Sequence, residues 1–228
     1  KIAIPSTMKN EKGNFLGLFA INNDYPTNLS KAKAYLKRFE SFEQNPIYLD
    51  SAFILLNKTD IDFPSFIQYY YLMGNNKGLI NFAINNSIDV VKYSNSDLAL
   101  AYSRMGEVFA LNNLTVDSEK YYNNAVSLMP LVIDYKLKLG AFLIDNKQLK
   151  LAKVIFETAL ALNPTYKEIH LNLGYIFILQ KKYLKSDLYL KQAIALDPDY
   201  VLAYENLVLS SQIQNKMKDV KVYLNKIL

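Results

Sequence analysis

Few residues of this 228-residue chain are of types that catalyse reactions. It contains one His and no Cys. Without Cys this stretch has no disulfide, thiolate metal site, cysteine nucleophile or covalent haem attachment, and a single His argues against a histidine-based metal site. No GxGxxG or GxxxxGK[ST] motif occurs, and the acidic residues form no recurrent pair. We therefore predict no enzyme activity, no cofactor and no metal.

Charge and aromatic content raise the alternative of nucleic-acid binding. The net charge is +5, but of 26 basic residues only Arg38 and Arg104 are Arg, which leaves 24 Lys spread along the chain. Nucleic-acid sites favour clustered charge and Arg at base edges. Lys181, Lys182 and Lys185 cluster at one turn, and we interpret them as solvated side chains of that turn. The longest uncharged run, residues 63–76, is 14 residues long, short of the ~20 that span a bilayer. We predict neither a nucleic-acid partner nor membrane insertion.

A 34-residue repeat supplies the elements that position these side chains. Six columns of similar residues recur at that spacing: Met105, Leu139 and Leu173; Gly106, Gly140 and Gly174; Phe109, Leu143 and Phe177; Tyr122, Phe156 and Leu190; Ala125, Ala159 and Ala193; Pro130, Pro164 and Pro198. Within 167–200, apolar residues at helical spacing predict one helix over 168–180 and another over 184–198, ended by Pro198. Gly174 and Ala193 are small where two helix backbones approach closely.

This pattern resembles the tetratricopeptide repeat: Leu-Gly early in the first helix, an aromatic three residues on, then small-x3-aromatic-x2-Ala and Pro. The match is strong over 99–200 and weaker over 31–98 and 201–228. The resemblance implies an all-α fold, a right-handed superhelical solenoid of antiparallel helix pairs with one continuous core. It also implies a non-catalytic protein–protein interaction scaffold. Val208 departs from the pattern by replacing Gly.

The frame divides the chain into segments of one solenoid domain. Residues 1–30 are a lead-in with one packing helix at 15–21. Residues 31–98 form two degenerate hairpins, with helices near 29–43, 47–57, 65–76 and 79–93. Three well-matched repeats fill 99–200, and 201–228 is a partial fourth. Ile227 and Leu228 are apolar where a terminal repeat usually carries a polar face, which predicts a fragment of a longer protein.

In the family, the first helix of each repeat lines a concave groove that holds an extended peptide. Its sixth position here is polar throughout: Arg104, Lys138, Asn172 and Asn206. Asn offers both a donor and an acceptor to a peptide backbone, Arg can bind a carboxylate through two parallel bonds, and Lys supplies a point charge. The remaining residues expected on this surface are apolar or acidic: Leu137, Leu171, Tyr175, Ile178, Leu209, Asp134, Glu168 and Glu205. The family's carboxylate-clamp pattern is not met.

The residues that could still suggest chemistry occupy packing columns. Tyr102, Lys136 and Tyr204 occupy the position of His170 in the other repeats. Because this is a packing position of the first helix, we predict that His170 has a structural role. Ser118 and Ser186 replace the usual small Ala and are interpreted as packing residues rather than nucleophiles. The in-register aromatics are likewise assigned to the core instead of to base stacking.

Two other hypotheses remain open. The stretch FLGLFAINND…KAKAYLKRFESFEQNPIYLDSA is similar to the junction before repeat tails in some bacterial multihaem c-type cytochromes. On that resemblance the chain is the structural tail of a larger exported enzyme or electron-transfer protein, and its compartment is periplasmic; otherwise it is cytoplasmic. The open C-terminal repeat also suggests self-association.

Overall fold

The structure, a computed structural model, describes residues 27–228. Over these residues the chain forms twelve α-helices, one five-residue π-helical segment, one three-residue 3₁₀ segment and no strand. The predicted all-α class is therefore confirmed. Contacts divide the chain after Leu128 into two compact units, which we call the N-terminal and C-terminal units and describe separately. The packing helix expected at 15–21 lies outside the described residues.

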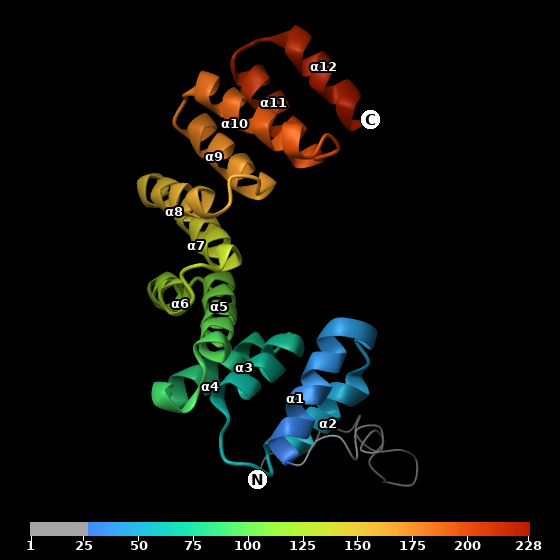
Figure 1. The fold of residues 1–228 in the computed structure, drawn as a ribbon, viewed down its shortest axis with the longest axis vertical. Helices are drawn as coiled ribbons and strands as arrows, with labels where there is room; N and C mark the ends of the chain where they lie inside the picture. The colour runs from blue at the N-terminus through green and yellow to red at the C-terminus, as the bar shows by residue number, and fades with distance from the viewer. Residues whose placement is uncertain (1–26) are drawn as a thin grey trace. The chain divides into compact units, whose positions relative to one another are not determined.

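The N-terminal unit contains six α-helices, drawn from blue to green in Figure 1. Their bounds are α1 Asn28–Arg38, α2 Pro46–Leu56, α3 Phe63–Leu72, α4 Asn76–Asn85, α5 Asn95–Leu111 and α6 Thr115–Leu128, with the π-helical η2 at Phe39–Glu43 and the 3₁₀ η3 at Val90–Lys92. Successive helices pack in pairs, and α3 also packs against α1 and α5. The helices expected near 29–43 and 47–57 are observed as α1 with η2 and as α2.

Local sequence explains where these helices begin. A reciprocal capping box joins Thr27 and Ser30 at α1, since each side chain accepts the other's backbone N–H. Asn45 caps α2, and Pro46 occupies the first turn, where its missing N–H costs nothing. Asp62 caps α3 in the same way. These caps satisfy amide groups that a helix start would otherwise leave unpaired.

The predicted boundaries of the next pair are wrong. We expected helices near 65–76 and 79–93, whereas α3 ends at Leu72 and α4 ends at Asn85. Gly74 adopts a positive φ of 63° and turns the chain there. Asn75 then caps α4 by accepting the Gly78 N–H, so Gly78 lies inside a helix. A linker containing η3 follows, which explains why this pair departs from the 34-residue frame.

The C-terminal unit contains six α-helices, from yellow to red in Figure 1. Their bounds are α7 Ile133–Asp145, α8 Leu149–Leu162, α9 Lys167–Leu179, α10 Tyr183–Leu196, α11 Val201–Ile213 and α12 Met217–Ile227. We call α7, α9 and α11 the A helices and α8, α10 and α12 the B helices. Each B helix is packed against its own A helix, α8 and α10 also pack against the next A helix, and α9 contacts both α7 and α11. The helix pair predicted at 168–180 and 184–198 is observed as α9 and α10.

The same turn joins the two helices of the α5–α6, α7–α8, α9–α10 and α11–α12 pairs. The second residue after the first helix of each pair has positive φ: Asn113 (61°), Lys147 (61°), Lys181 (58°) and Asn215 (57°). At Lys181, its N–H donates to the Ile178 carbonyl, and the Lys182 N–H donates to the Phe177 carbonyl, both at 2.8 Å. This is the Schellman arrangement, which satisfies carbonyls at a helix end. It recurs every 34 residues and reverses the chain at a fixed point of each repeat.

The three in-register glycines are sites of close helix approach. A Cβ added at Gly140 would lie 2.4 Å from Cζ of Phe156, and one at Gly174 would lie 2.7 Å from Cδ2 of Leu190. Gly106 faces the Tyr122 ring in the same way. The large residue of each second helix therefore fills the space that the glycine leaves. The close approach of two helices that we predicted at Gly174 is confirmed.

Candidate functional site

The A helices carry three polar residues in register, which we call the ladder: Lys138 on α7, Asn172 on α9 and Asn206 on α11. Lys138 is exposed, and the two Asn side chains are half-buried. Because α9 packs against both neighbouring A helices, successive rungs stand on adjacent helices. The structure thus keeps these three expected residues within one compact unit and within reach of solvent.

Both ladder amides already donate a hydrogen bond within their own helix. Asn172 Nδ2 donates to the Glu168 carbonyl at 2.8 Å, and Asn206 Nδ2 donates to the Leu202 carbonyl at 2.9 Å. Each Asn can therefore offer its amide oxygen, and the second N–H of its Nδ2 group, without breaking a bond. An oxygen acceptor suits the backbone N–H groups of an extended peptide.

The apolar residues expected on this surface divide into two groups. Ile178 is buried, 4% exposed, in a cluster with Leu190 and Leu207, against which Leu171 packs. Ile178 is thus a core residue and has no surface to offer a ligand. Leu137 and Tyr175 are half-buried, and Leu209 is exposed, so these three remain on the candidate surface.

The acidic residues expected here are also accessible. Asp134 is exposed and accepts a hydrogen bond of 2.9 Å from the Tyr166 hydroxyl. That bond raises the pKa of Tyr166, since the phenol donates to a carboxylate. Glu205 is exposed and Glu168 is half-buried. We call the solvent-accessible surface of the A helices the A-helix face. The carboxylates of these three acidic residues and the ladder amide oxygens therefore accompany Lys138 on this face.

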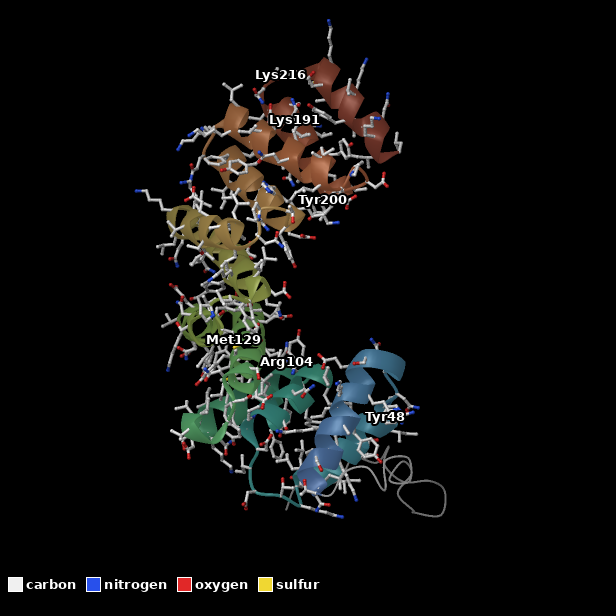
Figure 2. All side chains as sticks on the ribbon, viewed as in Figure 1. Tyr48, Arg104, Met129, Lys191, Tyr200 and Lys216 are labelled. Atoms are coloured by element: carbon white, nitrogen blue, oxygen red, sulfur yellow. The ribbon has the colours of Figure 1, made fainter. Side chains whose placement is uncertain are left out.

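Arg104, the fourth expected polar rung, lies on α5 of the N-terminal unit (Figure 2) and is buried, with 4% of the residue exposed. Its Nη2 lies 2.6 Å from Oε1 of Glu40, and its guanidinium stacks 5.1 Å from the Tyr71 ring centre. The Tyr71 hydroxyl in turn donates to Glu107 at 2.9 Å. Burial is the main cause of the raised pKa of the Tyr71 phenol, and this hydrogen bond is the second. Arg104 is therefore committed to internal pairing rather than to a peptide carboxylate.

The single histidine is anchored in the packing. His170 is 6% exposed, and its Nε2 lies 2.7 Å from the Pro164 carbonyl. A carbonyl only accepts, so Nε2 carries the hydrogen, and the buried Nδ1 has no hydrogen-bond partner. The ring lies against Tyr189. The environment of His170 is that of the structural residue we expected.

Ser118 and Ser186 are both fully buried at the position of a small packing residue. Ser118 donates to the Gly106 carbonyl at 2.7 Å, which links α6 to α5. The Ser186 hydroxyl has no hydrogen-bond partner. Neither hydroxyl reaches solvent as a nucleophile must. Among the described residues, no group of three or more His, Cys, Asp and Glu side chains could hold a metal ion.

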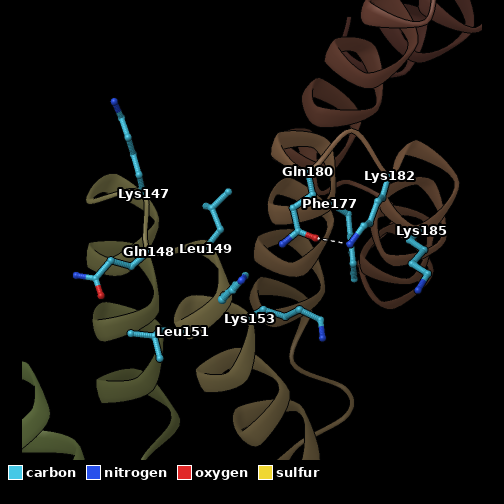
Figure 3. Close-up of a pocket in the computed structure, with 10 residues that line it drawn as sticks. Lys147, Gln148, Leu149, Leu151, Lys153, Phe177, Gln180, Lys182 and Lys185 are labelled. Carbon is cyan, nitrogen blue, oxygen red and sulfur yellow. Dashed lines mark hydrogen bonds between the residues drawn. The ribbon is translucent and has the colours of Figure 1, made fainter.

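Sequence reasoning missed a basic pocket of about 780 Å³ in the C-terminal unit (Figure 3). Lys182 and Lys185, which we assigned to a solvated turn, form one side of it. Lys147, Lys150 and Lys153 belong to the preceding repeat and line it as well. Residues 147 and 181 occupy the same position of the 34-residue repeat. Aligning the repeats would therefore have shown that the lysines near 147 and those near 181 lie at equivalent turns of neighbouring repeats.

Comparison with known proteins bears on the fold. The family model described as tetratricopeptide repeat matches residues 133–166 and 167–200, so these two helix pairs are tetratricopeptide repeats. A search of curated proteins found no match. In the part of the chain that the structure describes, no helix is long and apolar enough to cross a bilayer.

Solved structures of similar fold include three that are informative here. The crystal structure of MamA has a TM-score of 0.59 at 17% identity and covers 74% of this chain and 94% of that one. PilW, a type IV pilus biogenesis factor, has a TM-score of 0.59 at 19% identity, with 71% and 72% covered. A thermophilic TPR protein of Thermus thermophilus has a TM-score of 0.54 at 18% identity, with 69% and 84% covered. These likenesses confirm the predicted repeat fold.

Proposed function

We propose that this protein is a non-catalytic interaction scaffold whose A-helix face in the C-terminal unit binds an extended peptide. The observation that carries the proposal is the ladder, one polar residue on each of three contacting helices. Tetratricopeptide repeats support a role in protein–protein interaction. The choice of an extended peptide rests on the chemistry of the ladder.

The spacing of the ladder suits an extended chain. Packed helices lie about 8–10 Å apart, and an extended peptide rises about 3.3 Å per residue. Successive rungs would therefore meet every third peptide residue or so. Asn172 and Asn206 would accept from the peptide backbone, Lys138 would attract a carboxylate, and Leu137, Tyr175 and Leu209 would contact apolar side chains.

The test begins with selection from an arrayed library of random extended peptides. The double variant Asn172→Ala/Asn206→Ala should bind a selected peptide about tenfold more weakly, because two hydrogen bonds are worth roughly 0.5–1.5 kcal/mol each. The matched control is Gln192→Ala/Asn225→Ala, which removes two exposed amides from the B helices. Unchanged affinity of the ladder variant would refute the peptide-binding surface, as would failure to select any peptide.

Self-association through the C-terminal repeat and attachment to a larger exported protein stay predictions. Light scattering over a range of concentrations tests the first, and a strictly monomeric protein would contradict it. The gene sequence upstream of Lys1 tests the cytochrome version of the second, which requires CxxCH motifs there.

A further inference from the structure

The basic pocket lies between two A–B turns of the C-terminal unit. Its walls come from the start of α8, the end of α9 and the start of α10 (Figure 3). Its lining residues are Lys147, Gln148, Leu149, Lys150, Leu151, Lys153, Phe177, Gln180, Lys182 and Lys185. The pocket thus uses none of the ladder residues, which stand on the A helices away from these turns.

Charge is the dominant property of this pocket. Five of its lining residues are Lys, and within the described chain no Asp or Glu lines it. Lys153 is partly neutralised by Glu157 at 2.9 Å on the same helix, and Lys182 donates to Gln180 at 3.0 Å. Lys147, Lys150 and Lys185 are exposed, so several ammonium groups remain available to attract an anion.

The pocket also has an apolar side. Leu151 is 53% exposed, and Leu149 is half-buried. Phe177 is 4% exposed, and the Lys185 ammonium lies over its ring at 5.8 Å from the ring centre, so the ring offers no open face for stacking. A smaller pocket formed in part by Lys181, Leu184 and Gln214 shares Lys182 and Lys185 with this one. The basic surface therefore continues toward α11, with the 84% exposed Leu184 beside it.

We propose that this pocket binds an acidic segment of a partner protein, with carboxylates paired to the lysines and an apolar side chain against Leu149 and Leu151. Lys is a compact point charge that suits single carboxylates. Single-stranded nucleic acid would require exposed aromatic faces and favours Arg, neither of which this pocket offers. A concave site of this volume also suits a side chain better than a flat lipid surface.

The chain's own leading segment does not suit this site. Residues 1–26 contain three Lys against one Glu and one Asp, so their charge has the same sign as that of the pocket. Complementarity therefore points to a separate acidic partner. The site is independent of the peptide-binding ladder, and either can fail without the other.

The probe is a short fluorescein-labelled peptide in which Asp and Glu flank two Leu, titrated against the full chain at low salt. Lys182→Glu/Lys185→Glu should weaken binding at least about tenfold, since attraction becomes repulsion at two contacts. Lys191→Glu/Lys221→Glu makes the same charge change at exposed B-helix positions outside the pocket and should leave affinity within about twofold. Added salt should weaken binding, because the ammonium groups are exposed.

Three further arms decide the outcome. Lys150→Gln/Lys182→Gln, which only neutralises charge, replaces the reversal variant if that one fails to fold. Asn172→Ala/Asn206→Ala should not affect this probe, which separates the pocket from the ladder. Equal binding by pocket and control variants would overturn the proposal. So would failure of the peptide to bind while phosphatidylserine vesicles bind through the same two lysines.

Discussion

Replacing Gly140 with alanine tests whether close helix approach, rather than chance, keeps glycine in this column. The new Cβ would lie 2.4 Å from Cζ and 2.7 Å from Cε1 and Cε2 of Phe156, which is fully buried. Carbon atoms in contact prefer about 3.5–4.0 Å, so the ring must move by roughly 1 Å. Overpacking of this kind costs about 1–3 kcal/mol.

Helix propensity acts in the opposite direction. Alanine favours a helix over glycine by about 0.8–1.0 kcal/mol. With the strain near the upper end of its range, the net loss of stability is about 2 kcal/mol. For a unit of roughly 100 residues, 1 kcal/mol shifts the melting temperature by about 4–8 °C. We therefore expect the transition of the C-terminal unit to fall by about 10 °C, measured by circular dichroism and urea unfolding.

The neighbouring residue supplies the calibration. Ala141 is exposed on the same helix, so Ala141→Gly should lower stability by the propensity difference alone, about 1 kcal/mol. If Gly140→Ala instead raised stability by a similar amount, the space between α7 and α8 would be larger than the structure shows. The explanation of the glycine column would then be refuted.

Three other predictions follow from the described contacts. Lys181→Gly should stabilise the protein by about 0.5–1 kcal/mol in urea unfolding, because only glycine adopts positive φ without strain, and Asn215→Gly should gain less because Asn tolerates this conformation. Ser186→Ala should stabilise by about 1 kcal/mol by removing an unpaired buried hydroxyl, whereas Ser118→Ala should destabilise similarly by losing its bond to Gly106; equal effects would contradict this. Burial, with Asp50 and Tyr70 nearby, raises the pKa of Tyr69 from 10.0 to about 12, so its contribution to stability is complete below pH ~10 and is lost as pH rises toward 12. Alkaline unfolding should therefore be shallower in Tyr69→Phe, and an unchanged profile would contradict the assignment.

The repeat could be predicted from sequence because its causes are local and periodic. A glycine on one helix and a bulky residue on the next must recur together wherever two helices approach, so Gly140 and Phe156 reveal the packing. Boundaries between Leu72 and Asn85 were predicted less well. The stretch from Gly74 to Gly78 offers two glycines and two Asn residues, and sequence alone does not show which glycine takes positive φ.

The candidate surface could be predicted only in part. Lys138, Asn172 and Asn206 follow from their common register, which is a sequence property. Arg104 has the same register, but its partner Glu40 is 64 residues away, and no local pattern connects the two. Ile178 occupies a position that lines the concave groove in the family, so sequence places it on the surface. Only its contacts with Leu190 and Leu207 show that it is buried.

The ion pair between Arg104 and Glu40 also has a consequence for the order of folding. Forming it closes a 64-residue loop, and the entropy cost of closure rises with loop length. In the C-terminal unit, Tyr166 bonds to a residue 32 positions away and Lys167 to one 30 positions away, about one repeat. Structure there can propagate from one hairpin to the next, whereas the N-terminal unit must bring η2, which carries Glu40, and α5 together before this contact contributes. Hydrogen exchange should thus be graded along the C-terminal unit, with α11 and α12 opening first, and more uniform across α1, α3 and α5.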